Sequence, residues 1–299
     1  MWSRWTLLAL ACLASCKDAD PVEPGWMASL GDDRLLSELS IPGTHDSGAY
    51  YEPFTGVAKC QALSIADQLA AGVRYFDLRC RNVGDQFLIY HGGVDQNQTY
   101  DELLATMYAF LDAHPTETVI ASVKEEATPA NPTLPFDARF AAYLAKDPAR
   151  WYTATTIPRL GDARGRLVLL RRFPTTSPPL GIDASQWADN TTFTVTNTAS
   201  LRIEDAYVVT DNNAKWSAVT SLLAEARTPA DPGTLFLTYT SGYQLMMGLP
   251  NIPSVADDLD ARIDAVLADP ANAQAHLGVL VMDFVTAARA KAIAATNPK

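Results

Sequence analysis

The chain has 299 residues, a net charge of −11, four cysteines and four histidines. A hydrophobic fraction of 48% with only 19% charged residues is typical of a chain that buries a sizeable core, which excludes a disordered protein. With 23 Lys and Arg against 34 Asp and Glu, we expect no nucleic-acid partner and no general attraction to anionic membranes, and four cysteines are too few for a disulfide scaffold.

The amino-terminal sequence MWSRWTLLALACLASC has the features of an export signal. Arg4 supplies a positive start, and the apolar run that follows is about half of the roughly 20 residues that a membrane-spanning helix needs. The ending LASC resembles the bacterial lipobox, in which the cysteine becomes the acylated first residue of the mature protein. We therefore expect a lipoprotein-type signal peptide over residues 1–15, a lipid on Cys16 and a polar tether over residues 16–25. The alternative is an ordinary secretory signal with an incidental cysteine. In both cases the protein is exported from a bacterium, as a cell-envelope lipoprotein or a secreted protein.

Two cysteines remain in the rest of the chain, Cys60 and Cys80. Export makes a disulfide between them chemically possible. Two buried thiols are the alternative, and the sequence leaves both open.

Short β-rich runs alternate with helical patterns along the chain, with no internal linker between two compositions. The predicted strands cover residues 39–41, 73–81, 87–91, 118–125, 166–173, 206–211, 234–240 and 277–284. Several are almost continuously apolar, as in strands buried on both faces. This order predicts an α/β fold over residues 26–299, a single-domain (β/α)8 TIM-type barrel. The link between the second and third strands is too short for a helix, so we expect the barrel to be irregular.

Local signals predict where several helices begin and end. Thr99 followed by Glu102 forms a capping box, and Ser254 with Asp257 predicts a second helix start. Gly72 is expected to end the helix predicted around residues 64–71.

Polar residues gather where the predicted strands end, which is where catalytic groups collect in such barrels. These residues are His45 and Asp46, Asp77 and Arg79, His91, Lys124 and Glu126, Arg172, and Asp283. Imidazoles, cations and carboxylates meeting at one rim are hard to obtain from a purely structural barrel.

Two histidines with a nearby arginine suit an in-line displacement at phosphorus. One imidazole removes a proton from the attacking hydroxyl and the other protonates the leaving oxygen, while Arg79 binds the non-bridging oxygens with a bidentate geometry that lysine lacks. Asp46 and Asp283 are available to orient the histidines and raise their basicity. The rim has no compact set of carboxylates for a divalent ion, and Arg79 stands where a cation would otherwise lie. We therefore expect no metal and no cofactor.

The segments that carry these residues are LSIPGTHDSG, QLAAGVRYFDLRCR, IYHGG, HPTETVIASVKEE, LGDARGRLVLLRR and VMDF. In this order they resemble the bacterial phosphatidylinositol-specific phospholipase C family (PI-PLC X domain) over nearly all of residues 26–290. The resemblance implies an irregular (β/α) barrel and a lyase that converts phosphatidylinositol into diacylglycerol and inositol 1,2-cyclic phosphate. The FDLR segment has Arg79 where the metal-dependent eukaryotic relatives carry acidic ligands, which implies metal independence.

The resemblance also implies a role for each site residue. His45 would be the general base toward the inositol 2-hydroxyl, oriented by Asp283. His91 would be the general acid, assisted by Asp46, and Arg79 would hold the phosphate. The implied substrate-binding residues are Asp77, Lys124, Glu126, Arg172, Asp205 and Tyr207. As an alternative, Lys124 and Arg172 form ion pairs at the rim.

Phosphatidylinositol in a membrane is the expected partner of a monomeric enzyme. Some bacterial members of the family use exposed tryptophans on rim loops, and the corresponding loops here have none. The loop SGYQLMMGLPNIP instead offers Tyr243, Leu245, Met246, Met247 and Leu249, and the loop after the first strand offers Tyr50, Tyr51 and Phe54. We expect one of these loops to enter the lipid interface, with packing over the barrel mouth as the alternative.

The remaining histidines are assigned to structure, His114 to a helix end and His276 to the surface. Two other functions stay open on the same barrel. A glycerophosphodiester phosphodiesterase would depend on a metal and lose activity with a chelator. A non-catalytic module that binds inositol lipids or glycans would show no turnover, and the complete set of catalytic residue types speaks against it.

Overall fold

The computed structural model describes residues 25–299. The predicted signal peptide, Cys16 and all but the last residue of the predicted tether lie outside the described residues. Within residues 25–299, none of the helices has both the length and the apolarity needed to cross a membrane.

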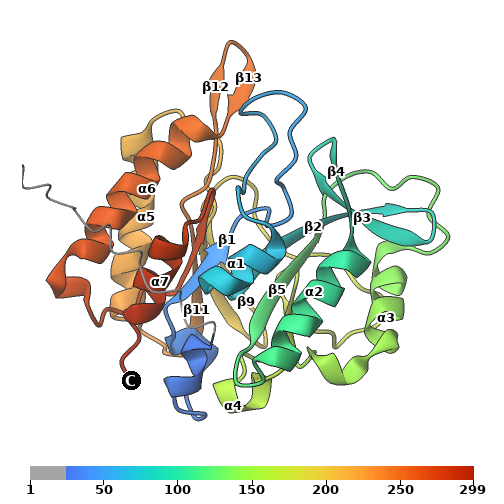
Figure 1. The fold of residues 1–299 in the computed structure, drawn as a ribbon, viewed down its shortest axis with the longest axis horizontal. Helices are drawn as coiled ribbons and strands as arrows, with labels where there is room; N and C mark the ends of the chain where they lie inside the picture. Colours follow the sequence, from blue (N-terminus) through green and yellow to red (C-terminus); the bar gives the residue numbers. More distant parts are fainter. Residues whose placement is uncertain (1–24) are drawn as a thin grey trace, which may run out of the picture.

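The centre of the fold is one curled sheet of mostly parallel strands (Figure 1). The strands of this sheet are β1 Ile41–Thr44, β2 Tyr75–Val83, β3 Gln86–His91, β4 Val94–Thr99, β5 Val119–Glu125, β6 Trp151–Tyr152, β7 Leu167–Arg171, β8 Ile182–Asp183, β9 Thr192–Thr196, β10 Ser200–Glu204, β11 Thr234–Tyr239 and β14 Val279–Met282. Two further strands, β12 Gln244–Met246 and β13 Leu249–Asn251, form a separate antiparallel hairpin. The order across the sheet is β6-β7-β5-β2-β1-β14-β11-β10-β9, and every neighbouring pair is parallel except the last. In the described part of the chain no strand pairing joins β6 to β9. The predicted α/β barrel is therefore confirmed, including its irregularity.

The longer helices lie on the outer side of this sheet (Figure 1). They are α1 Ile65–Ala71, α2 Tyr100–Ala113, α3 Phe136–Lys146, α5 Asn212–Arg227, α6 Pro253–Ala268 and α7 Ala287–Ala295. The short α4 Leu160–Ala163 and the 3-10 turns η1 Trp26–Ser29 and η2 Leu36–Glu38 pack against the inner core instead, and two further turns are η3 Pro148–Arg150 and η4 Pro270–Asn272. Alternate strand residues serve two cores. On β14, Val279 and Val281 belong to the inner core, whereas Leu280 and Met282 pack toward the helices. Burial on both faces explains why these strands are almost continuously apolar.

Two of the predicted helix boundaries are confirmed and one is wrong. Gly72 ends α1 with a left-handed φ of 105°, and Thr99 and Glu102 form the reciprocal capping box of α2. The helix predicted to open at Ser254 begins one residue earlier, at Pro253, and its Ser254 N–H donates to the Asn251 side chain at 3.1 Å. Proline fits the first helical position because its φ is already helical and its missing N–H would be unpaired there.

The predicted strand over residues 206–211 is wrong. The strand is β10, which ends at Glu204, and residues 206–211 are irregular apart from a single bridge between Val208 and Tyr243. β10 has the alternating pattern SLRIE, with Arg202 turned outward to Glu225. The link between β2 and β3 is a tight antiparallel turn, so β3 leaves the barrel and pairs with β4.

The two remaining cysteines, Cys60 and Cys80, are free and buried, which agrees with the second of the two alternatives that the sequence left open. Cys80 lies on β2, where it faces the helices, and Cys60 lies in the β1–α1 loop beside Ala49. Strand pairing holds the first, and the backbone bond from Phe284 N to the Cys60 carbonyl, 2.7 Å, holds the second. The fold therefore places the two thiols in separate parts of the core.

Candidate active site

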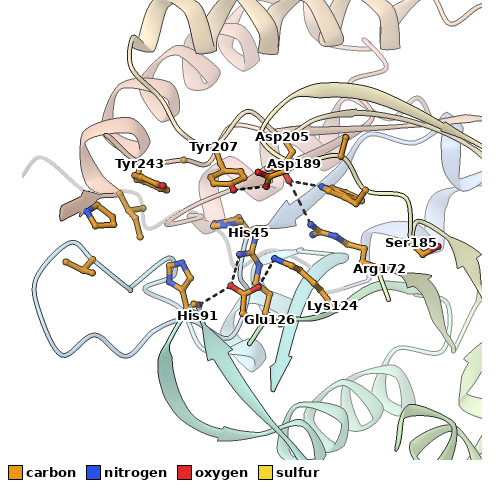
Figure 2. Close-up of a pocket in the computed structure, with 18 residues that line it drawn as sticks. His45, His91, Lys124, Glu126, Arg172, Ser185, Asp189, Asp205, Tyr207 and Tyr243 are labelled. Carbon is orange, nitrogen blue, oxygen red and sulfur yellow. Dashed lines mark hydrogen bonds and ion pairs between the residues drawn. The ribbon is translucent and has the colours of Figure 1, made fainter. Parts of the chain in front are cut away.

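A cavity of about 380 Å³ opens at the carboxyl ends of the parallel strands (Figure 2). Of the residues predicted from the sequence, its lining includes His45, Arg79, His91, Lys124, Glu126, Arg172, Asp205, Tyr207 and Tyr243. The predicted residues Asp46, Asp77 and Asp283 are buried and lie outside the lining. The structure thus brings all the predicted polar residues together in two layers, one facing the cavity and one supporting it.

His45 follows β1 directly and is held by a buried carboxylate. Its Nδ1 lies 2.7 Å from Oδ1 of Asp283, which follows β14. The parallel pairing of Thr44 with Met282 places the two next residues side by side. A neutral imidazole that donates from Nδ1 to this carboxylate keeps Nε2 free to accept a proton.

His91 ends β3 and is held by a backbone carbonyl. Its Nδ1 lies 2.8 Å from the Ala58 carbonyl, whereas its Nε2 is 4.0 Å from Oδ2 of Asp46, beyond hydrogen-bond distance. The two histidine rings lie 6.3 Å apart at nearly a right angle. His91 is thus oriented by the loop before α1, and Asp46 acts on it only across a longer gap.

The proton of this Asp46–His91 pair favours the carboxyl group. Burial lowers the pKa of His91 to about 4, and the charge of Arg79 acts in the same direction. Burial raises the pKa of Asp46 well above its usual range, against the opposing charge of Arg79. From the sequence we expected Asp46 to raise the basicity of His91. The pKa of His91 is lowered instead, because the effect of burial outweighs the attraction between the two side chains.

The Arg79 guanidinium lies among three carboxylates. Its Nε is 3.0 Å from Asp77 and 3.8 Å from Asp46, and its Nη1 is 3.4 Å from Glu126. Asp77 also accepts from Arg172 at 3.1 Å, so both of its oxygens are used by cations. Asp77 therefore positions the two guanidinium groups at the cavity, instead of facing a ligand itself.

Lys124 and Arg172 form ion pairs, as one of the two alternatives from the sequence expects, and both side chains also line the cavity. Lys124 Nζ lies 2.8 Å from Glu126, and Glu126 also accepts from the Gly92 N–H at 2.9 Å. The Arg172 guanidinium lies 3.7 Å from the centre of the Trp187 ring. Each cation is fixed in direction before any ligand arrives.

Sequence analysis missed one wall of the cavity, formed by Ser185, Trp187 and Asp189 in the β8–β9 connection. Trp187 donates to Asp205 at 2.9 Å, and Asp189 accepts from the Tyr207 hydroxyl at 2.8 Å (Figure 2). The carboxylate of Asp189 raises the pKa of Tyr207 to about 12. β8 has only two residues, too short for a hydrophobic pattern, so no sequence signal marks the connection that follows it.

The two other described histidines do not line the cavity, and neither is fully exposed. His114 caps the end of α2 beside Phe110. His276 is part-buried, not on the open surface, with its Nδ1 2.6 Å from the Ala226 carbonyl.

Replacing Glu126 by glutamine is expected to flatten the acid limb of the stability profile. Although burial acts to raise it, the pKa of Glu126 is lowered to about 2 by Arg79 and Lys124. A depressed folded-state pKa contributes stability above the unfolded pKa, about 4.3, and this is lost as the pH falls toward 2. The wild-type protein should be more stable than Glu126→Gln at neutral pH, by an amount on the order of 3 kcal/mol that shrinks toward pH 2. Urea unfolding across this pH range measures the difference.

The matched control for that experiment is the neighbouring Glu125→Gln. Burial raises the pKa of Glu125, so this change should not flatten the acid limb. Parallel stability profiles for the wild type and Glu126→Gln would contradict the ion-pair argument.

The fold and the site together define a barrel enzyme that carries acid–base and anion-binding groups at the carboxyl ends of its strands. Comparison with known proteins makes the assignment specific. The family described as "Phosphatidylinositol-specific phospholipase C, X domain" matches residues 35–173. The chain belongs to the bacterial phosphatidylinositol-specific phospholipase C family, as its motifs led us to expect.

Individual relatives match over most of the chain. It is 31% identical over 275 residues to the 1-phosphatidylinositol phosphodiesterase of Staphylococcus aureus (strain Newman), covering 87% of each protein. It is 31% identical over 272 residues to the protein of the same name from Listeria monocytogenes, covering 87% of this chain and 80% of that protein. A crystal structure of phosphatidylinositol-specific phospholipase C from S. aureus, with pentafluoro-phenylalanine incorporated, aligns with a TM-score of 0.83 at 27% identity, over 92% of this chain and 98% of that one.

Proposed function

We propose that this protein cleaves phosphatidylinositol into diacylglycerol and inositol 1,2-cyclic phosphate, as a phosphatidylinositol diacylglycerol-lyase. The observation that carries the proposal is the pair of oriented imidazoles, His45 and His91, lining one cavity together with the Arg79 guanidinium. The names of the relatives, 1-phosphatidylinositol phosphodiesterase, support the choice of substrate.

In the proposed reaction His45 is the general base. Its Nε2 takes the proton of the inositol 2-hydroxyl, and the oxygen attacks the phosphorus. The imidazolium that forms is stabilised by the buried Asp283 carboxylate at 2.7 Å. Because the attacking hydroxyl belongs to the same inositol ring as the phosphate, the step is intramolecular and favoured by proximity.

The Asp46–His91 pair is the general acid of this reaction. It holds one proton, mainly on the carboxyl group, and the pair passes it to the diacylglycerol oxygen as the phosphorus–oxygen bond breaks. Arg79 meets the negative charge that grows on the non-bridging oxygens. Its contacts with Asp77 and Glu126 fix the direction of the guanidinium, which lines the cavity where the phosphate is proposed to bind.

The other side of the cavity is suited to a ring of hydroxyl groups. We propose that the sugar hydroxyls bind Lys124, Glu126, Arg172 and Asp205, and that the inositol ring packs against Tyr207. These residues alternate donors and acceptors around the wall and are already held by neighbours such as Trp187 and Asp189. Preorganised groups of this kind lose little freedom when a polar ligand binds.

We propose that catalysis needs no metal ion and no cofactor. The three acidic groups that would attract a catalytic cation already surround Arg79, whose guanidinium supplies the positive charge. A chelator is therefore expected to leave activity intact. A glycerophosphodiester phosphodiesterase on the same barrel would lose activity under that treatment.

Phosphorus NMR of the products tests the proposed function directly. Incubation with phosphatidylinositol vesicles should give the signal of a five-membered cyclic phosphate, and phosphatidylcholine vesicles should give no product. The proposal would be contradicted if only acyclic inositol phosphate were present from the first time points. Equal cleavage of phosphatidylinositol and phosphatidylcholine would contradict it as well. Absence of turnover would favour the non-catalytic binding module.

The hairpin of β12 and β13 is proposed as the contact with the lipid interface. Met247 at its tip is 99% exposed, and Leu245, Met246 and Leu249 are exposed as well. The hairpin projects beyond the helices next to the β1–α1 loop (Figure 1), where Phe54 is 73% exposed. Tyr243 instead packs near Tyr207 at the cavity and Tyr50 packs against the core, so these two residues are not part of the proposed contact.

Replacing Met246 and Met247 together by serine is expected to weaken binding to phosphatidylinositol vesicles by about 10- to 100-fold, since each buried CH₂ contributes about 0.8 kcal/mol. Vesicle sedimentation measures the change. Cleavage of a soluble, monomeric substrate should stay at the wild-type level, because the hairpin tip does not line the cavity. Unchanged vesicle binding would contradict insertion of the hairpin.

We propose that the protein is exported as a monomer and anchored through a lipid on Cys16. Mass spectrometry of the mature protein tests this by identifying its first residue and any acyl chain. The described chain starts at the amino ends of the strands, where Trp26 bonds the Gly72 carbonyl and Met27 bonds Glu117. The cavity and the hairpin lie at the opposite, carboxyl ends. An anchor on Cys16 would therefore be attached through the tether to the end of the barrel opposite the mouth.

A further inference from the structure

Cys60 lies between the two histidine–carboxylate pairs, in a place that the proposed reaction does not use. Its side chain is fully buried, and its Sγ lies 3.7 Å from Nδ1 of His91. One possible ligand atom from each of Asp46, Cys60 and His91 lies within 4.8 Å of the other two. The same holds for His45, Cys60 and Asp283, so the thiol is common to both groups.

The carboxylates around this thiol keep unused acceptor oxygens. Neither oxygen of Asp46 has a hydrogen-bond partner, nor has Oδ2 of Asp283, and both side chains are buried. The charged atoms nearest to Asp46 are Arg79 Nε at 3.8 Å and His91 Nε2 at 4.0 Å. Buried acceptors without partners are uncommon, because each costs free energy that a donor or a cation would offset.

We infer that Cys60, His91 and Asp46 form a binding site for a soft divalent cation such as Zn²⁺ or Cd²⁺. A thiolate, an imidazole nitrogen and a carboxylate oxygen are a donor set that Zn²⁺ uses, with a water in the fourth position. The donor atoms of a tetrahedral zinc site lie roughly 3–4 Å apart, since the zinc–ligand bonds are about 2.0–2.3 Å. The three ligand atoms lie within 4.8 Å of one another, so they have to move closer by about 1 Å to reach that geometry. A cation bound to Nδ1 of His91, the nitrogen nearest to Cys60, also replaces the hydrogen bond of that nitrogen to the Ala58 carbonyl.

Binding releases two protons from the protein, one held by the Asp46–His91 pair and one held by the Cys60 thiol. The Cys60 thiol, whose pKa is raised well above its usual range by burial, gives its proton to solvent as the sulfur–metal bond forms and the ion loses hydration water. The cation enters from the cavity, which His91 lines. Hard cations such as Mg²⁺ and Ca²⁺ prefer oxygen ligands and are not expected to bind this thiolate site.

The consequence is inhibition, and this part rests on the proposed function. A cation bound to His91 and Asp46 occupies both members of the pair that delivers the proton to the leaving oxygen. The enzyme would then work without a metal and be switched off by zinc. Cys60 itself takes no part in the reaction, so its removal leaves the basal activity unchanged.

Cadmium titration of the full chain tests the site without reference to activity. The proteins compared are the wild type, Cys60→Ala, Cys60→Ser and the matched control Cys80→Ala, a thiol equally buried but in the core behind β2. The wild type and Cys80→Ala should show one more equivalent of thiolate–cadmium charge-transfer absorption than the two Cys60 variants. Equal absorption in all four folded proteins, checked by their unfolding transitions, would overturn the site.

Zinc inhibition is measured on the same proteins. The zinc concentration for half-inhibition should rise in both Cys60 variants by more than the roughly 10- to 100-fold that loss of an outer-shell partner costs, because a direct ligand is removed. Cys80→Ala should be inhibited like the wild type. Cadmium bound through Cys60 without loss of activity would overturn the inhibition and leave the site standing. Failure of the proposed function can be distinguished from failure of the metal site. It would appear as absent turnover even without zinc, whereas the cadmium absorption would still differ between the wild type and the Cys60 variants.

Discussion

Replacing His45 by alanine is expected to lower the turnover of phosphatidylinositol by about 10²- to 10⁴-fold, the usual contribution of a positioned general base. The imidazole is held by Asp283 at 2.7 Å and lines the cavity. Alanine leaves the inositol 2-hydroxyl without a proton acceptor, so the attacking oxygen stays a poor nucleophile. The initial rate of diacylglycerol release measures the loss.

Substrates with different leaving groups distinguish the proposed role of His91 from that of His45. His91→Ala should lose a similar factor on phosphatidylinositol but recover most of it on an inositol phosphodiester with a nitrophenyl leaving group. Nitrophenolate departs without being protonated, so an acid is no longer needed. His45→Ala should not recover, because the attacking hydroxyl still has to lose its proton.

His114→Ala is the matched control, since this histidine stacks on Phe110 outside the cavity. It should keep wild-type turnover on both substrates. Equal responses of His45→Ala and His91→Ala to the change of leaving group would contradict the assignment of base and acid.

Replacing Arg79 by lysine is expected to lower kcat by about 10²- to 10³-fold, the usual effect of losing one preorganised donor to a developing anion. The guanidinium contacts Asp77 and Glu126 while it faces the cavity. The lysine ammonium keeps the charge but is a point donor without the planar fork, so it cannot hold the carboxylates and the phosphate at once. Steady-state kinetics should show the loss mainly in kcat, because the donor acts most strongly on the transition state.

Arg81→Lys is the control on the same strand. Arg81 is two residues further along β2 and donates to the Thr128 carbonyl, outside the cavity. Its replacement should leave kcat close to the wild-type value. Near-normal turnover of Arg79→Lys would show that a positive charge alone is sufficient, and it would contradict the proposed need for bidentate binding of the phosphate.

The fold class could be predicted because it depends on local patterns. Apolar runs such as 118–125 and 277–284 correspond to β5 and β14, and the capping box at Thr99 opens α2. The run over 206–211 was wrong because hydrophobicity alone does not show whether a segment finds a hydrogen-bonding partner in the sheet. Its neighbour β10 has partners on both sides, β9 and β11.

The candidate site could be predicted as a set of residues, but less so as a set of contacts. The parallel strands bring His45 and Asp283 together, as their positions after two strands predict. The longer gap between His91 and Asp46, and the support of His91 by Ala58, depend on the path of the β1–α1 loop. The wall that contains Trp187 follows a two-residue strand and has no sequence pattern of its own.

The sequence by itself determined the barrel, its catalytic rim and the family, because these follow from periodicity and from short motifs at strand ends. Only the tertiary structure decided that Cys60 and Cys80 are separate thiols, since their spacing in space depends on which strands and loops hold them. It also decided that Asp77 supports two guanidinium groups from behind the cavity and that burial shifts the shared proton from His91 toward Asp46. Burial and distance are properties of packing between segments far apart in the chain, which no local pattern encodes.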